Sequence, residues 1–222
     1  MKTISILLIT SLFCAGLRAG SKYEEAMHAA MDKFGSAASI AELQAAAAQF
    51  ERIAEAEPDE WIPGYYASLI YCIITFRTED TAEKEAFLEH CQLLVDNAMK
   101  IAPEESELHT LQGMIYQAYI GIDPMQYGQI YSSKANGAFQ VATRLNPGNP
   151  RPYYLQALSL MHTPREYGGG KTAALPLFEK AMELFNQQPL DKGFYPTWGK
   201  EDCEQNLQLC RTEAALNASE NK

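Results

Sequence analysis

The segment that comes nearest to a catalytic motif is the run from Tyr167 to Thr172, which reads Tyr-Gly-Gly-Gly-Lys-Thr. Its last three residues match the end of a phosphate-binding loop, in which backbone N–H groups and a lysine surround the phosphates of a nucleotide. That loop also needs a glycine five residues before its last glycine, and here this position is Arg165. The loop must follow a β-strand, whereas residues 153–161 have the pattern of a helix. We therefore interpret the segment as a glycine-rich turn that opens a helix.

Other groups that could bind a metal or catalyse a reaction are scattered along the chain. Glu89, His90 and Cys91 are consecutive, so on a helix their side chains point in three directions. The other histidines lack a partner at metal-ligand spacing, and there is no Gly-x-Ser-x-Gly nucleophile motif. The sequence thus predicts no catalytic residue, no cofactor and no metal site, and favours a binding protein over an enzyme.

The first twenty residues have the composition of a secretory signal peptide. Lys2 precedes an uncharged run over residues 4–17, and small residues follow near position 20. The run is shorter than the ~20 apolar residues that a membrane-spanning helix needs. Phe13, directly before Cys14, argues against lipidation of that cysteine. We predict an exported, periplasmic protein that is not inserted in the membrane once residues 1–20 are removed.

The charge of the chain excludes several classes of partner. Removal of residues 1–20 takes away Lys2 and Arg18 and no acidic residue, which changes the formal net charge from −10 to −12. Nucleic acids and anionic lipid surfaces attract clusters of Lys and Arg, and the sequence contains no such cluster. We therefore expect no nucleic-acid partner.

Four cysteines remain after residue 20, and an even number in an exported chain suggests disulfides. Cys203 and Cys210 would lie ~10 Å apart along one helix, beyond the reach of a disulfide. We expect four buried thiols. A bond between Cys72 and Cys91 across a helical hairpin is the alternative.

The chain contains an internal repeat with a period of 44 to 45 residues. Three amphipathic runs end at Pro58, Pro103 and Pro147, where a helix cannot continue. Each run has a small residue, a larger apolar residue four positions later and a second small residue three positions after that. The clearest copy is Ala135, Phe139, Ala142 and Pro147, and further copies begin at Ala46, Cys91 and Ala174.

This pattern resembles the second helix of the tetratricopeptide repeat family, although the period exceeds that family's usual 34 residues. The resemblance implies an all-α fold, a right-handed superhelix of about four tetratricopeptide-like helical hairpins over residues 21–186. Small residues at facing positions would let antiparallel helices approach closely, and the larger residue would fill the space to the next hairpin. The predicted helices are 22–34, 39–56, 60–77, 81–101, 104–120, 128–145, 149–162 and 171–186.

A Pro/Gly loop over residues 187–199 should follow the last hairpin, then a capping helix over 200–217 and a disordered tail over 218–222. The capping helix would bury one face, formed by Cys203, Leu207, Cys210 and Ala214. Over about residues 105–200 the Pro, Gly and Trp positions look like those of a group of exported bacterial tetratricopeptide proteins of unestablished role. Trp198 is expected to seal the end of the last hairpin.

In tetratricopeptide arrays, the first helices of successive hairpins line a concave groove. Transferring the groove positions one by one selects aromatic and polar residues of the kind that anchor protein interfaces. They are Trp61, Ser68, Tyr71, Thr110, Met114, Gln117, Arg151, Tyr154, Leu158 and His162. The leading hypothesis is a scaffold or adaptor that holds a protein or peptide in this groove. The alternative for Trp61, Tyr71 and Tyr154 is that they pack between hairpins.

A second functional hypothesis is a helical-repeat carrier of a small solute that accompanies a periplasmic transport system. A pocket enclosed by Tyr116, Tyr119, Tyr127 and Tyr131 would suit that role. Self-association into a homo-oligomer through the concave face is a further alternative.

Overall fold

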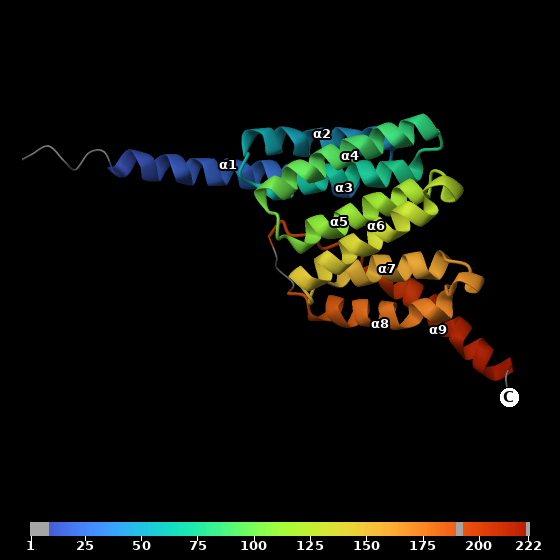
Figure 1. Ribbon diagram of the computed structural model, residues 1–222. Coiled ribbons are helices and arrows are strands. Elements are labelled where there is room, and N and C mark those ends of the chain that lie inside the picture. The colour runs from blue at the N-terminus through green and yellow to red at the C-terminus, as the bar shows by residue number, and fades with distance from the viewer. Residues whose placement is uncertain (1–8, 190–192, 221–222) are drawn as a thin grey trace, which may run out of the picture.

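The computed structural model describes residues 9–189 and 193–220, and these residues form α-helices joined by short loops, without a β-strand (Figure 1). The all-α prediction is therefore confirmed. Residues 1–8 of the predicted signal peptide lie outside the described part of the chain, and its cleavage stays a prediction. The helices are α1 (Ile9–Ser36), α2 (Ile40–Ala56), α3 (Trp61–Arg77), α4 (Thr81–Ile101), α5 (Ser106–Ile120), α6 (Pro124–Leu145), α7 (Pro150–His162), the short 3-10 helix η1 (Arg165–Tyr167), α8 (Lys171–Gln187) and α9 (Lys200–Glu220).

Capping side chains explain where several helices begin. Ser39 and Glu42 form a reciprocal capping box at the start of α2. At the start of α6, Asp123 accepts hydrogen bonds from the backbone N–H groups of Met125 and Gln126, and Pro124 occupies the first turn. This helix starts four residues before the predicted position, so the extra residues of the long repeat lengthen α6 instead of forming a loop.

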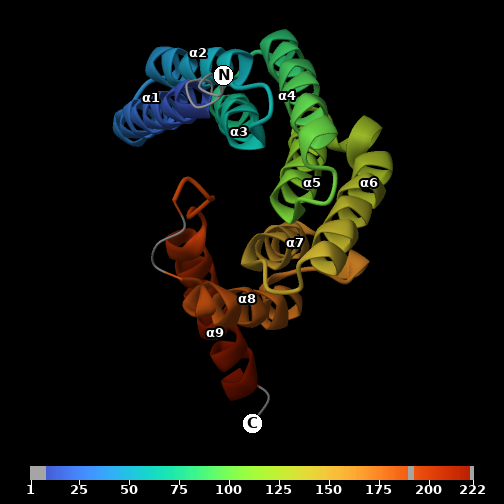
Figure 2. The same ribbon diagram turned by 90° about the vertical axis from the view of Figure 1, so that its left-hand side faces the viewer.

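Consecutive helices pack as antiparallel hairpins, α1 with α2, α3 with α4, α5 with α6 and α7 with α8, and α9 packs on α8. Seen along the helices, the molecule is a crescent (Figure 2). The inner side is lined by α3, α5 and α7, and the outer side by α2, α4 and α6. This is the predicted superhelix of four hairpins with a terminal cap.

The repeat pattern performs the packing role expected of it. Ala135, Phe139 and Ala142 are all buried. The ring of Phe139 occupies the space that a side chain at Gly113 would need, because a Cβ built there would lie 2.3 Å from Cε1 of Phe139. The small residue in α5 and the large one in α6 are therefore one packing unit, which fixes how closely the two helices approach.

The buried apolar residues form two cores. The first lies among α1 to α5, and the second joins α6, α7, α8 and α9. Met114 and Trp198 pack against both. In α3 every residue from Pro63 to Ile70 is buried, because α2 and α4 cover its outer side and the segment before α9 reaches its inner side. Of the described helices, none is long and apolar enough to cross a membrane.

The C-terminal part departs from the prediction in its length. The predicted inward face of α9 is confirmed, since Cys203, Leu207 and Cys210 are buried. The helix continues to Glu220, however, so residues 218–220 are helical where a disordered tail was expected. All four described cysteines are buried free thiols, Cys72 and Cys91 included.

The glycine-rich segment is a turn that opens α8, as predicted. Gly168 and Gly170 have positive φ angles of 82° and 102°, a conformation that favours glycine. A Cβ at Gly169 would lie 2.1 Å from the carbonyl oxygen of Thr163. These glycines are needed for a tight return of the chain, which gives them a structural role without a phosphate ligand.

Candidate functional site

Half of the inner face of the crescent is covered by the chain's own segment 193–199. The indole N–H of Trp198 donates a hydrogen bond of 2.8 Å to the Tyr65 hydroxyl on α3. Phe194 makes edge contacts with the rings of Tyr23 and His28 on α1, at 5.9 and 4.9 Å. The Tyr195 hydroxyl donates to the carboxylate of Glu105. The segment therefore lies over the N-terminal ends of the inner helices, where an extended ligand was predicted.

A buried cation holds this segment in place. Arg151 on α7 is fully buried, and its Nη1 donates to Oε1 of Glu107 on α5 at 2.9 Å. Its Nη2 donates to the carbonyl oxygen of Pro196 at 2.6 Å. The guanidinium also lies 5.2 Å from the ring of Trp198. A charge removed from water needs such partners, so the segment and the ion pair depend on each other.

The residues of the predicted groove lie in different environments. Arg151 and Tyr154 are buried, and the Tyr154 ring packs on Phe178 and Phe185. Trp61 is half-buried between Tyr65 and Tyr195. These residues lie beneath or beside segment 193–199, and only Trp61 keeps part of its surface in solvent.

Tyr71 and Ser68 lie on another side of α3. The Tyr71 hydroxyl donates to Glu51 of α2 at 2.9 Å, and its ring meets the ring of His90 on α4 at 4.7 Å. Ser68 donates to the carbonyl oxygen of Cys91. The face of α3 that turns inward carries Tyr65 instead. Tyr71 and Ser68 therefore do not line the inner face to which the family resemblance assigned them.

Beyond Trp198, the C-terminal halves of the inner helices leave an apolar surface open. Phe76 follows Tyr65 by eleven residues, or three turns, and so shares its inward face, and 57% of it is exposed. His162 follows Arg151 by the same spacing and is exposed. We call this surface the open half of the inner face. From helical spacing and partial exposure we assign to it Ile73, Phe76, Met114, Leu158 and His162.

The open half combines apolar side chains with one imidazole. Gln117 stiffens it by tying α5 to α7, through hydrogen bonds to the carbonyl oxygen of Leu155 at 2.9 Å and to Oγ of Ser159 at 2.6 Å. Three predicted groove residues, Met114, Gln117 and His162, lie at or beside this surface. Such a surface can bind a flat apolar molecule, and the imidazole can ligate a transition metal.

The four tyrosines of the solute-carrier hypothesis do come together, but on the outer side of the crescent. Tyr119 and Tyr131 stack with centroids 4.6 Å apart, and Tyr116 and Tyr127 contact Tyr131 at 5.8 and 5.5 Å. Burial raises the pKa of Tyr119 to about 12, helped by Tyr131 and by nearby carboxylates. The Tyr119 phenol is therefore neutral at physiological pH. The rings of the stacked pair leave no room for a ligand between them.

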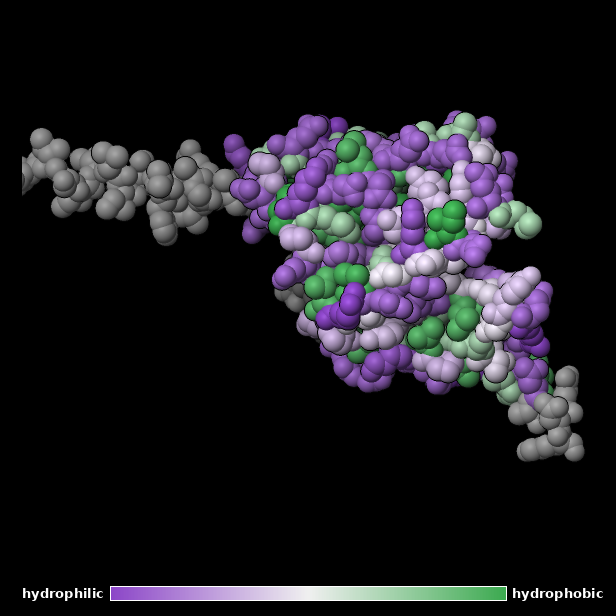
Figure 3. Space-filling view, in the orientation of Figure 1, coloured by the Kyte–Doolittle hydropathy of each residue, from purple (hydrophilic) through white to green (hydrophobic). Residues whose placement is uncertain are grey.

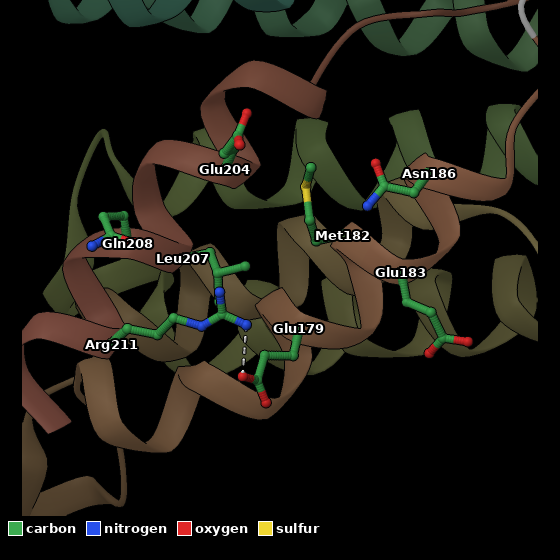
Figure 4. Close-up of a pocket in the computed structure, with 8 residues that line it drawn as sticks. All are labelled: Glu179, Met182, Glu183, Asn186, Glu204, Leu207, Gln208 and Arg211. Atoms are coloured by element: carbon green, nitrogen blue, oxygen red, sulfur yellow. Dashed lines mark hydrogen bonds and ion pairs between the residues drawn. The ribbon is translucent and has the colours of Figure 1, made fainter. Parts of the chain in front are cut away.

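A separate hollow of about 380 Å³ lies between α8 and α9 (Figure 4). The ion pair between Arg211 and Glu179, at 3.1 Å, crosses it. Its carboxylates outnumber this single guanidinium, so it would repel an anionic ligand. The lining residues are Glu179, Met182, Glu183 and Asn186 of α8 with Glu204, Leu207, Gln208 and Arg211 of α9.

Sequence reasoning missed Tyr65, Phe76 and Glu107. A signal for Glu107 was present, because it precedes Arg151 by 44 residues, one repeat period, which places the pair at equivalent positions of α5 and α7. Trp198 lies beyond the repeats, in the Pro/Gly loop, so the repeat pattern does not assign it a contact with Tyr65, 133 residues away. Trp198 was expected to seal the last hairpin, and it also joins that hairpin to α3.

Comparison with known proteins adds one informative relative. No family model matches the chain, and no curated protein sequence matches it either. Among solved structures, the HusA haemophore from Porphyromonas gingivalis superposes with a TM-score of 0.74 at 30% sequence identity. The match covers 87% of this chain and 93% of the haemophore chain. Similarity of this extent in both sequence and structure shows that the chain belongs to the same family as the HusA haemophore.

Proposed function

We propose that this protein is a binding protein that carries haem. The observation that supports this most strongly is the 30% identity to a haemophore over 87% of the chain. Of the two hypotheses drawn from the sequence, the carrier of a small ligand therefore has more support than the protein scaffold. We also propose that the protein is exported, and that its hairpins are lengthened tetratricopeptide repeats, on the evidence of the small–large–small packing at Gly113 and Phe139.

The open half of the inner face is the proposed haem site. Haem presents a flat apolar ring, which suits the surface of Phe76, Met114 and Leu158. Its iron accepts an imidazole ligand, and exposed His162 at the end of α7 can supply one. The two carboxylates of haem would remain in solvent, because the chain has a net charge of −10 and the hollow between α8 and α9 is acidic.

A protein or peptide held along the whole inner face has less support. Segment 193–199 already covers the N-terminal half through Trp198, Arg151 and Pro196. An extended peptide would have to displace it and leave the buried guanidinium without one of its partners. A flat ligand on the C-terminal half requires no such displacement.

The proposal is tested by titrating the mature protein with haem and following the Soret absorbance. We expect saturable binding at one haem per chain. Phe76→Asp should weaken binding about tenfold or more, because covering a Phe side chain contributes about 1.5–3 kcal/mol. His162→Ala should shift the Soret maximum of bound haem, because the iron loses its imidazole ligand. Iron-free protoporphyrin should bind the unmodified protein and the His162→Ala variant with equal affinity.

Leu93→Asp is the matched control, since 56% of Leu93 is exposed. Leu93 lies two positions from buried Cys91, so it points away from α3 on the outer side. We expect this substitution to leave haem affinity unchanged. Absence of a Soret change in the unmodified protein would refute the carrier proposal, and equal losses for the two Asp variants would refute the proposed site.

A further inference from the structure

The outer side of the crescent carries an aromatic group that the haem proposal does not use. The tyrosine cluster, defined as Tyr116, Tyr119, Tyr127 and Tyr131, reaches α4 through the hydrogen bond from Tyr127 to Glu85. Tyr116 and Tyr119 come from α5, and Tyr127 and Tyr131 come from α6. All four rings are half-buried, so each keeps part of its surface in contact with solvent.

Carboxylates border this cluster along α4. Glu85, Glu89 and Asp96 are spaced by four and seven residues, which places them on one face of the helix. The Tyr127 hydroxyl donates to Oε1 of Glu85 at 3.4 Å, so this face is turned toward the rings. Aromatic faces and carboxylates both attract cations, and here they occur side by side.

A cation of the chain itself already lies on these rings. The Nζ of Lys134 is 4.9 Å from the centroid of Tyr131 and 5.6 Å from that of Tyr116. Lys134 is exposed, so its ammonium group could be fully hydrated. It lies against the ring faces instead. The cluster therefore provides a position at which an ammonium or guanidinium group is stabilised.

We propose that the tyrosine cluster and the acidic row of α4 bind a Lys or Arg side chain of a partner protein. A protein partner fits better than a small amine because large apolar side chains stand exposed nearby on the same two helices. Leu93 on α4 is 56% exposed, and on α6 Ile130 and Met125 are 57% and 96% exposed. A protein surface would cover such residues, whereas a small cation would leave them in water.

The outer face shows this mixed character over α4 and α6, with polar surface interrupted by separate hydrophobic patches (Figure 3). The proposed partner site lies on the side of α5 opposite the open half of the inner face. A partner bound there would not block the proposed haem site. This inference goes beyond the carrier proposal and does not depend on it.

The test uses a fluorescein-labelled pentapeptide in which two arginines flank a leucine, and a matched peptide with citrulline in place of arginine. Binding to the full mature protein is followed by fluorescence anisotropy at low salt, where charge interactions are least screened. We expect the arginine peptide to bind at least tenfold more tightly than the citrulline peptide. Equal binding of the two peptides would overturn the proposal.

Variants distinguish the contribution of the Tyr131 ring from that of its hydroxyl group. They also distinguish a local effect of Lys134 from an effect of the protein's net charge. Tyr131→Phe should retain affinity and Tyr131→Leu should lose about two- to fivefold, as expected for an exposed cation–π contact. Glu89→Gln, at an exposed position, should also weaken binding and serves if Tyr131→Leu fails to fold. Lys134→Gln should strengthen binding more than Lys33→Gln, which makes the same charge change on α1.

Each of these outcomes can contradict the proposal independently of haem binding. Unchanged affinity in both Tyr131→Leu and Glu89→Gln would overturn it. Equal effects of Lys134→Gln and Lys33→Gln would show that only net charge matters, which would also overturn it. If free argininamide bound as tightly as the peptide, the assignment to a protein partner would be wrong.

Discussion

Replacing Arg151 by Met should be among the most destabilising single changes in this protein. The guanidinium is fully buried, and its partner Glu107 has only 5% of its side chain exposed. Arg151→Met leaves the Glu107 carboxylate buried opposite an apolar side chain and removes the hydrogen bond to Pro196. Breaking one side of a buried ion pair typically costs about 3–5 kcal/mol.

For a chain of 222 residues, each 1 kcal/mol lowers the melting temperature by roughly 2–4 °C, so the expected loss is about 6–20 °C. The double variant Arg151→Met/Glu107→Leu should recover part of this loss, because replacing both charges by apolar groups avoids a buried carboxylate that has lost its guanidinium partner. The double variant still lacks the hydrogen bond to Pro196, so we do not expect full recovery.

Urea unfolding followed by circular dichroism measures these differences, and tryptophan fluorescence reports in parallel whether Trp198 leaves the guanidinium. Arg144→Met is the control, because Arg144 is exposed and should change the free energy of unfolding by less than about 0.5 kcal/mol. A loss below about 1 kcal/mol for Arg151→Met, or a double variant less stable than the single one, would refute the reasoning.

Three further outcomes are expected. Gly113→Ala should lower the free energy of unfolding by about 1–3 kcal/mol in urea, because the ring of Phe139 must move. Gly137→Ala, on the open side of α6, should raise the free energy of unfolding by about 0.5–1 kcal/mol. Asp123→Ala should cost about 1 kcal/mol in the same assay through loss of the α6 cap. The pKa of Tyr119 is about 12 in the folded protein and about 10 in the unfolded chain. The contribution of the neutral phenol to the free energy of unfolding is therefore complete below pH ~10 and is lost as the pH rises through 12. Absorbance at 295 nm should show delayed ionisation of the buried tyrosines, and Tyr119→Phe should reduce the delayed signal by one tyrosine.

The sequence was sufficient to predict the hairpins, because their packing depends on local residue size. Ala135, Phe139 and Ala142 bury one side of α6 wherever the neighbouring helix lies. The start of α6 could also have been predicted from Asp123 and Pro124, a common capping pair, whereas the predicted helix begins only at Gly128. A glycine within a helix costs only about 1 kcal/mol, which tertiary packing offsets.

The surface that faces inward was harder to predict than the helices. It depends on the rotation of each hairpin about its axis, which is set by contacts between helices distant in sequence. Tyr71 and Tyr65 are six residues apart on α3, yet one meets α2 and α4 and the other meets Trp198. A sequence pattern shows that both are candidates for burial, but it does not indicate which side the next hairpin leaves open.

The position of α5 leads to a prediction about the two proposed sites, since this helix contributes Met114 to the inner face and Tyr116 and Tyr119 to the outer one. Two reciprocal hydrogen bonds between Gln92 and Gln112, of 2.7 and 2.8 Å, fix α5 to α4, and the hydrogen bonds of Gln117 fix it to α7. A helix held on both sides should transmit little movement from one face to the other. We therefore expect the arginine peptide to bind the haem-free and haem-saturated protein with affinities that agree within about twofold, as measured by anisotropy. A change beyond fivefold would mean that haem moves α5, because binding sites can influence each other only through a difference in free energy between two states of the protein.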